Sequence, residues 1–158
     1  MAASPSSQSP RRTASTCTPE TARGTHTFRI EGYSLFRDLG VGKCVQSAIF
    51  SVGGYDWSIC FYPDGDTEEE GRKGWVSVYL VLKTNDAVVR AIYDLTLVDQ
   101  TCTPPPPTPP SFRWPNPSVV DPVVFDNRGS HSDASGYFFR KTELVKDSPY
   151  VLDDAIVF

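Results

Sequence analysis

The segment that decides the fold is residues 51–65, which read SVGGYDWSICFYPDG. Large apolar side chains recur at every second position of its middle part, a pattern typical of a pleated strand with one buried face. Gly53 and Gly54 tolerate the positive φ of a two-residue hairpin turn, and Pro63 presets φ for a second turn. The sequence therefore predicts a hairpin whose core-facing residues are Tyr55, Trp57, Ile59 and Phe61.

Further segments at short, regular spacing have strand patterns, and the turns between them are rich in Gly, Asn, Asp and Pro. No segment has a helical period of useful length. Pro122 restricts one of the strands to a sheet edge, because proline cannot donate to a ladder. The pattern predicts an all-β fold, an antiparallel β-sandwich of about seven or eight strands. The additional strands are expected over residues 25–31, 43–52, 75–82, 88–98, 119–125 and 155–158.

The strand expected over residues 75–82 has two different faces. One is purely aliphatic and belongs to the core. The other carries Trp75, Ser77, Tyr79 and Val81. This mixed face is interpreted either as a second packing surface or as part of a peptide-binding face.

Composition limits the function classes. The chain has 158 residues and a net charge of −4, which suits one domain and does not favour nucleic acid as a partner. No apolar run approaches the roughly 20 residues of a membrane helix, so no membrane partner is expected. The four cysteines, Cys17, Cys44, Cys60 and Cys102, form no C-x-x-C pair and are expected to be reduced thiols in the nucleus or the cytoplasm.

Two segments have a composition that opposes packing. Residues 1–23 are rich in Ser, Thr and Pro, contain arginines and are interpreted as a disordered leader, with an organelle transit peptide as the alternative. Residues 103–117 include four consecutive prolines, Pro104 to Pro107. This stretch is expected to be an inserted surface loop, or else a ligand for SH3 or WW-type domains.

No motif predicts catalysis, a metal or a cofactor, so the chain is not expected to be an enzyme. Residues 40–43 read GVGK but lack the first glycine and the Ser or Thr of a phosphate-binding loop. His26 has no neighbouring acid or cysteine cluster and is expected to pack or cap. The acidic stretch 66–74 is expected to be a solvated loop rather than a metal site.

Three stretches also carry a family resemblance: residues 24–34 read GTHTFRIEGYS, residues 40–43 read GVGK and residues 50–57 read FSVGGYDW. They resemble the first part of a MATH (meprin and TRAF homology) domain, and their sequence is most similar to that of plant MATH-BTB proteins. The resemblance runs from Gly24 to the C-terminus and implies a MATH domain over residues 24–158. The last strand is expected to be cut short, with no BTB domain after Phe158.

The resemblance implies a peptide-binding groove on one face of the sandwich. The family's groove tyrosine matches Tyr79, and a second groove aromatic matches Tyr93. Strand alternation instead places Tyr93 on the core face with Leu95, so both interpretations stay open for this residue.

A loop is expected to complete the groove. In the family this loop reads Trp-Gly followed by Phe or Tyr, and its closest match here is Ser135-Gly136-Tyr137. Ser135 therefore stands where the family has an aromatic anchor, which predicts weaker binding or a different peptide. Asp133 is expected to add a polar contact.

By resemblance, the chain recognises short Ser/Thr-rich segments of substrate proteins, as the substrate-recognition part of an adaptor for a cullin-3-type RING ubiquitin ligase. The alternatives are a decoy or scaffold without ligase coupling and a non-functional remnant. Without a BTB domain, no cullin contact is expected.

Overall fold

A computed structural model of the chain describes residues 13–18, 20–69, 73–101, 113–114, 122–126, 137–145 and 147–158. Nearly all regular structure in these residues is β-strand, and every strand pair is antiparallel. The expected all-β antiparallel sandwich is therefore confirmed.

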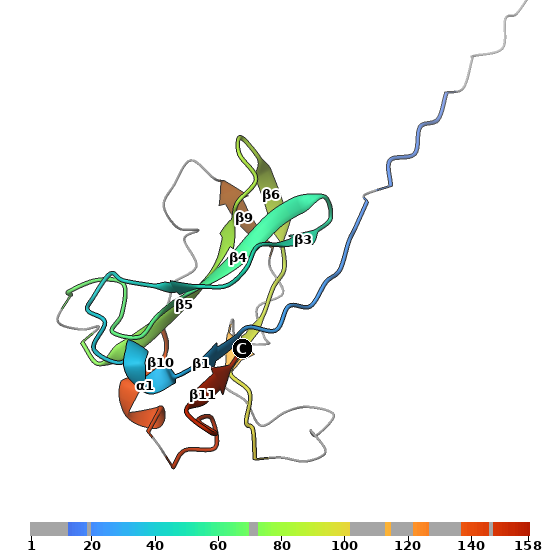
Figure 1. Ribbon diagram of the computed structural model, residues 1–158. Coiled ribbons are helices and arrows are strands. Elements are labelled where there is room, and N and C mark those ends of the chain that lie inside the picture. Colours follow the sequence, from blue (N-terminus) through green and yellow to red (C-terminus); the bar gives the residue numbers. More distant parts are fainter. Residues whose placement is uncertain are drawn as a thin grey trace, which may run out of the picture.

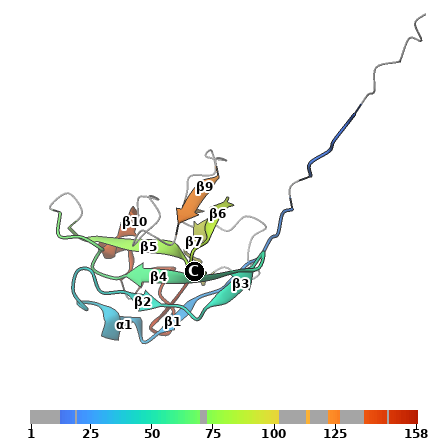
Figure 2. The same ribbon diagram turned by 90° about the horizontal axis from the view of Figure 1, so that it is seen from above.

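The central sheet is built on two eight-residue strands, β4 (Tyr55–Tyr62) and β5 (Trp75–Leu82). β10 (Tyr137–Arg140) pairs with β5, while β2 (Val45–Gln46) and β3 (Phe50–Val52) both pair with β4 (Figures 1 and 2). The hairpin predicted between β3 and β4 is present: Gly53 and Gly54 have φ of 63° and 78°, as a primed turn requires.

Three short strand pairs lie against one face of this sheet. β1 (Arg29–Glu31) pairs with β11 (Ala155–Val157), β6 (Val88–Ala91) with β9 (Val123–Asp126), and β7 (Leu95–Thr96) with β8 (Arg113–Trp114). Figures 1 and 2 place α1 and β10 toward one end of the central strands, and β3, β6 and β9 toward the other.

The core fills the space between these layers. Its larger cluster joins the inner faces of β4 and β5 to β1, β7 and β11, and includes Phe61, Val76 and Ile156, all with 0% exposure. A second cluster at the β6–β9 end contains Trp57, whose ring meets Phe125 edge-on at 5.0 Å. The expected position of Trp57 in the core is confirmed.

Two short helices close the end near β10. α1 (Tyr33–Phe36) follows Gly32, and η2 (Lys141–Glu143) follows β10. The Asp154 carboxylate accepts bonds from the Ser34 backbone N–H at 2.8 Å and from its hydroxyl at 2.7 Å. These bonds tie the first turn of α1 to the residue before β11, 120 positions away in the chain.

The prediction of a single strand over residues 43–52 is wrong, because residues 47–49 separate β2 from β3. Ser47 explains the break: its hydroxyl accepts the Ile59 backbone N–H at 2.9 Å, while its own backbone N–H bonds the Ile59 carbonyl. A side chain thus replaces the backbone acceptor at this point of the ladder, which is typical of Ser next to a strand irregularity.

The strand expected over residues 88–98 is likewise divided, into β6 and β7. β6 pairs with β9 and β7 with β8, and the Val98 backbone N–H then bonds Val157 of β11 at 2.9 Å. Residues 92–94 lie between these ladders, because the chain changes partners there. The strand expected over 119–125 is β9, which begins at Val123, after Pro122.

Candidate functional site

The face of β4 and β5 that points away from the main core is the candidate site, called here the Tyr79 face. The register pairs Cys60 with Tyr79 and Tyr62 with Ser77, so these side chains share one side of the sheet. A single buried face was expected for β4, and this is wrong. The Tyr79 face is buried as well, at Ser58, Cys60 and Tyr62.

Tyr79 lies deep in this face. Its side chain is 5% exposed and packs with Cys60 and Tyr62, with Val81 half-buried beside them. The Tyr62 and Tyr79 rings meet edge-on, with centroids 5.7 Å apart. Tyr79 is therefore positioned by its neighbours. On the same face of β5, half-buried Val81 lies next to it, and half-buried Trp75 lies beyond Ser77.

Asp66 holds the hydroxyl groups of this face. Its Oδ1 accepts the Ser77 hydroxyl at 3.0 Å, and its Oδ2 accepts the Tyr79 hydroxyl. Bonds to an ionised acceptor are stronger than neutral ones, so the carboxylate fixes the loop after β4 to β5. The expectation of a wholly solvated acidic loop is wrong at Asp66, although Glu68 and Glu69 are exposed.

Two cysteines lie beside these tyrosines. Cys44 precedes β2 and lies close enough to Cys60 and Tyr62 to raise the pKa of both groups. Burial, and then the neighbouring Cys44, raise the pKa of the Cys60 thiol to about 11, so it is protonated at neutral pH. Cys17, Cys44 and Cys60 are all unpaired thiols, as expected, and Cys102 lies outside the described residues.

Tyr93 lies away from the Tyr79 face. It is half-buried, packs against both core clusters and meets Phe125 of β9 with ring centroids 5.5 Å apart. Burial raises the pKa of its hydroxyl. Of the two interpretations of Tyr93, these contacts favour the packing role that alternation predicts.

The other predicted site residues either precede β10 in the sequence or begin it. Asp133, Ser135 and Gly136 lie outside the described residues, as does most of the Pro-rich stretch 103–117. Tyr137 begins β10, where its backbone pairs with Ser77. The structure thus brings the start of β10 to the edge of the Tyr79 face. At the far end of β10 the Arg140 guanidinium lies 5.0 Å from the centroid of the Trp75 ring.

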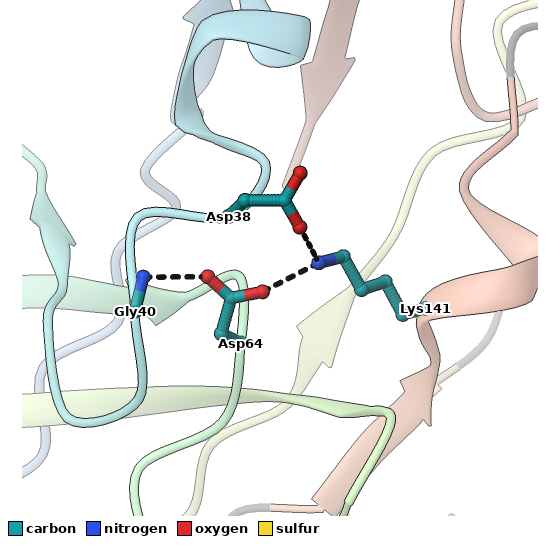
Figure 3. Close-up of polar contacts among 4 residues, drawn as sticks. All are labelled: Asp38, Gly40, Asp64 and Lys141. Carbon is teal, nitrogen blue, oxygen red and sulfur yellow. Dashed lines mark hydrogen bonds and ion pairs between the residues drawn. The ribbon is translucent and has the colours of Figure 1, made fainter.

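An ion cluster sits at the end of the sheet near α1 (Figure 3). The Lys141 ammonium donates to Asp38 at 2.8 Å and to Asp64 at 2.5 Å, and Asp64 also accepts the Gly40 backbone N–H at 2.7 Å. Asp64 is only 13% exposed, whereas Asp38 is 88% exposed. The cluster therefore joins the loop 38–40, the turn after β4 and η2.

The ion pair between Asp64 and Lys141 shifts the pKa values of both groups. Burial alone would raise the pKa of Asp64, but bonds from Lys141 and Gly40 outweigh it and lower that pKa. Burial likewise opposes the charge on Lys141, and the bonds to Asp38 and Asp64 raise its pKa. Both groups are therefore held in their charged forms at neutral pH.

Sequence reasoning missed Asp66, Tyr62, Cys44 and the Lys141 cluster. The positions of Cys60 and Tyr62 could have been predicted from the sequence. Once β4 and β5 are paired, strand alternation puts both residues on the same face as Tyr79. The partnership of Asp38, Asp64 and Lys141 carries no local signal, because the residues are up to 103 positions apart.

The described part of the chain gives little support for a ligand role of His26, a metal site or a membrane-spanning helix. His26 stacks on Phe50 with ring centroids 4.1 Å apart, which confirms its expected packing role. No group of three or more His, Cys, Asp or Glu side chains among the described residues is placed to hold a metal ion. Within the same residues, no helix has the length and apolar character needed to span a membrane.

Comparison with known proteins gives one consistent result. The family model described as MATH domain matches residues 25–158. Two Arabidopsis thaliana relatives, BTB/POZ and MATH domain-containing proteins 5 and 6, are 38% and 40% identical over 92% and 91% of the chain. The alignments cover 34% of each relative, so the chain spans about a third of their length.

A solved structure shows the same fold. TRAF5 of Notothenia coriiceps superposes with a TM-score of 0.57 at 20% sequence identity, covering 83% of this chain and 69% of that one.

Proposed function

Because the chain belongs to the MATH domain family, whose members are protein-interaction modules, we propose that it binds short extended segments of partner proteins on the Tyr79 face. The observation that carries this proposal is the Tyr62, Ser77, Tyr79 and Asp66 cluster. It gathers aromatic rings and hydroxyl groups on a sheet face outside the main core. An extended peptide adds its backbone to a sheet edge, here that of β10, and directs alternate side chains onto the neighbouring face.

The partner segment has a nonpolar residue, then a polar residue, then several Ser or Thr. Val81, half-buried next to Tyr79, accepts the nonpolar side chain. The Ser and Thr hydroxyls bond toward Asp133, Ser135 and Gly136, which precede β10 in the sequence, and toward Tyr137 at its start. Binding is expected to be roughly micromolar, about −8 kcal/mol, which suits a partner that must be released.

The biological role that fits is substrate recognition for a cullin-3-type RING ubiquitin ligase, in the nucleus or the cytoplasm. Two relatives carry BTB/POZ in their names as well as MATH, and this chain spans about a third of each. We therefore assign the recognition step to this chain and leave the ligase contact to co-purification with a cullin.

Peptide arrays test the recognition step. The full chain is probed with Ser/Thr-rich peptides that carry or lack the leading nonpolar residue. Binding should require that residue and fall about tenfold or more in Tyr79→Ala, since truncated aromatic anchors commonly cost about 2 kcal/mol at an interface.

The matched control is Tyr55→Ala, which truncates a half-buried tyrosine at the start of β4 on the opposite face. Circular dichroism first shows that both variants are folded. Equal loss of binding in both variants, or unchanged binding in folded Tyr79→Ala, would contradict the assignment of the Tyr79 face.

A further inference from the structure

The strand register brings two cysteines together at the edge of the Tyr79 face. β2 pairs with β4 so that Gln46 faces Cys60 and Val45 faces Phe61. Continued by one residue, this register places Cys44 opposite Tyr62 and diagonal to Cys60, on the same side of the sheet. Cys44 is accordingly close enough to Cys60 and Tyr62 to raise the pKa of both groups.

The two thiols differ in access. Cys44 is exposed, whereas Cys60 is 6% exposed and packs with Tyr62 and Tyr79. Cys44 also precedes the first ladder pair of β2. A disulfide needs Cα atoms within about 7 Å of one another, so bridging this diagonal pair requires Cys44 to move toward Cys60.

We propose that Cys44 and Cys60 are a redox modification site, at which a low-molecular-weight disulfide of the glutathione class reversibly oxidises the pair to a cross-strand disulfide. The Cys44 thiolate attacks one sulfur of glutathione disulfide, forms a mixed disulfide and releases one glutathione thiolate. The Cys60 thiolate then attacks the Cys44 sulfur and releases the second glutathione. Two protein thiols lose two electrons and two protons, and one glutathione disulfide becomes two glutathione thiols.

The burial of Cys60 makes the second step slow at neutral pH, because only the thiolate attacks. The pKa of this thiol is raised to about 11, so its thiolate fraction rises about tenfold with each pH unit between pH 7 and 9. The pair is accordingly reduced at rest and responds to sustained oxidation. In this respect it resembles cytosolic disulfides, which are usually transient and redox-sensing.

The experiment uses the full chain carrying Cys17→Ser and Cys102→Ser, so that only the pair remains. The folded protein is equilibrated in glutathione buffers of graded oxidation, alkylated and digested with a protease that cuts before aspartate. Cleavage before Asp56 separates the two cysteines. A covalently joined pair of peptides, reversed by reduced glutathione, is the expected result.

Single variants test the order of attack. Cys60→Ser should retain glutathione on Cys44, since nothing resolves the mixed disulfide, and Cys44→Ser should leave Cys60 largely unmodified. Glutathione release from the mixed disulfide should accelerate about tenfold per pH unit. A mixed disulfide at Cys44 that never resolves in folded protein, or linkage seen only in denaturant, would overturn the proposal.

Discussion

The two faces of the β4–β5 pair are both buried, but by different chemistry. The inner face is continuous hydrocarbon, with Phe61, Val76 and Val78 packed against β1, β7 and β11. The Tyr79 face is buried through hydroxyl groups held by Asp66 and around the buried Cys60 thiol. A substitution in the apolar face destabilises the fold when it removes volume. A substitution in the polar cluster destabilises it when a hydrogen-bonding group loses its partner. One sheet therefore separates the part that stabilises the fold from the part that is suited to recognition.

The largest effect is expected at the inner face. Phe61→Ala removes a ring with 0% exposure that contacts Phe158 and Tyr33. The lost transfer free energy and the cavity together should lower the free energy of unfolding by about 4 kcal/mol. Urea denaturation measures it, with Phe61→Leu as the milder control. A loss near 1 kcal/mol would show that the inner face is not the main stabilising layer.

A smaller loss of unfolding free energy is expected at Asp64, in the turn after β4. Asp64→Asn removes the charge that Lys141 and the Gly40 N–H bond, and should cost about 2 kcal/mol at pH 7. The pKa of Asp64 is lowered in the folded state, so its contribution is complete above the unfolded value of about 3.9 and is lost as pH falls through the folded value.

The measurement is the free energy of unfolding of wild type and Asp64→Asn from pH 7 down to about pH 2.5. The two curves should converge in the acid range. A difference that persists unchanged at the lowest pH would contradict an electrostatic role for Asp64. Asp38→Asn is the control: its carboxylate is exposed and bonds the same lysine, so its effect should be much smaller.

The sequence predicts the inner face much better than the Tyr79 face. Alternation over 55–62 and 75–82, the Gly53-Gly54 turn and the position of Trp57 all follow from local periodicity and turn chemistry. The break at Ser47 and the division of residues 88–98 do not, because they depend on which distant strand supplies the next hydrogen bond. The hydrogen bonds from Ser77 and Tyr79 to Asp66 were missed for a related reason. Acidic loop residues are usually solvated, and only tertiary contacts reveal the exception.

The Tyr79 face is tested by removing the acceptor common to its hydroxyls. Asp66→Asn keeps the shape but leaves a neutral amide between Ser77 and Tyr79, and should cost about 1 to 2 kcal/mol in unfolding free energy. Glu68→Gln is the matched control, because Glu68 lies on the same loop and is exposed. Equal effects of the two variants would mean that Asp66 does not hold the Tyr79 face.

The smallest expected effect compares the faces with one substitution. Val81→Thr places a hydroxyl on the half-buried side of β5 beside Tyr79, where polar partners already exist, and should change stability by about 0.5 kcal/mol or less. Val78→Thr places the same hydroxyl on the inner face, where Val78 is 2% exposed among hydrocarbon, and should cost about 2 kcal/mol. The two residues lie three positions apart on one strand, so propensity and volume cancel in the comparison. Urea denaturation of both variants therefore compares the burial and the chemistry of the two faces together, and equal losses would contradict the expected difference between them.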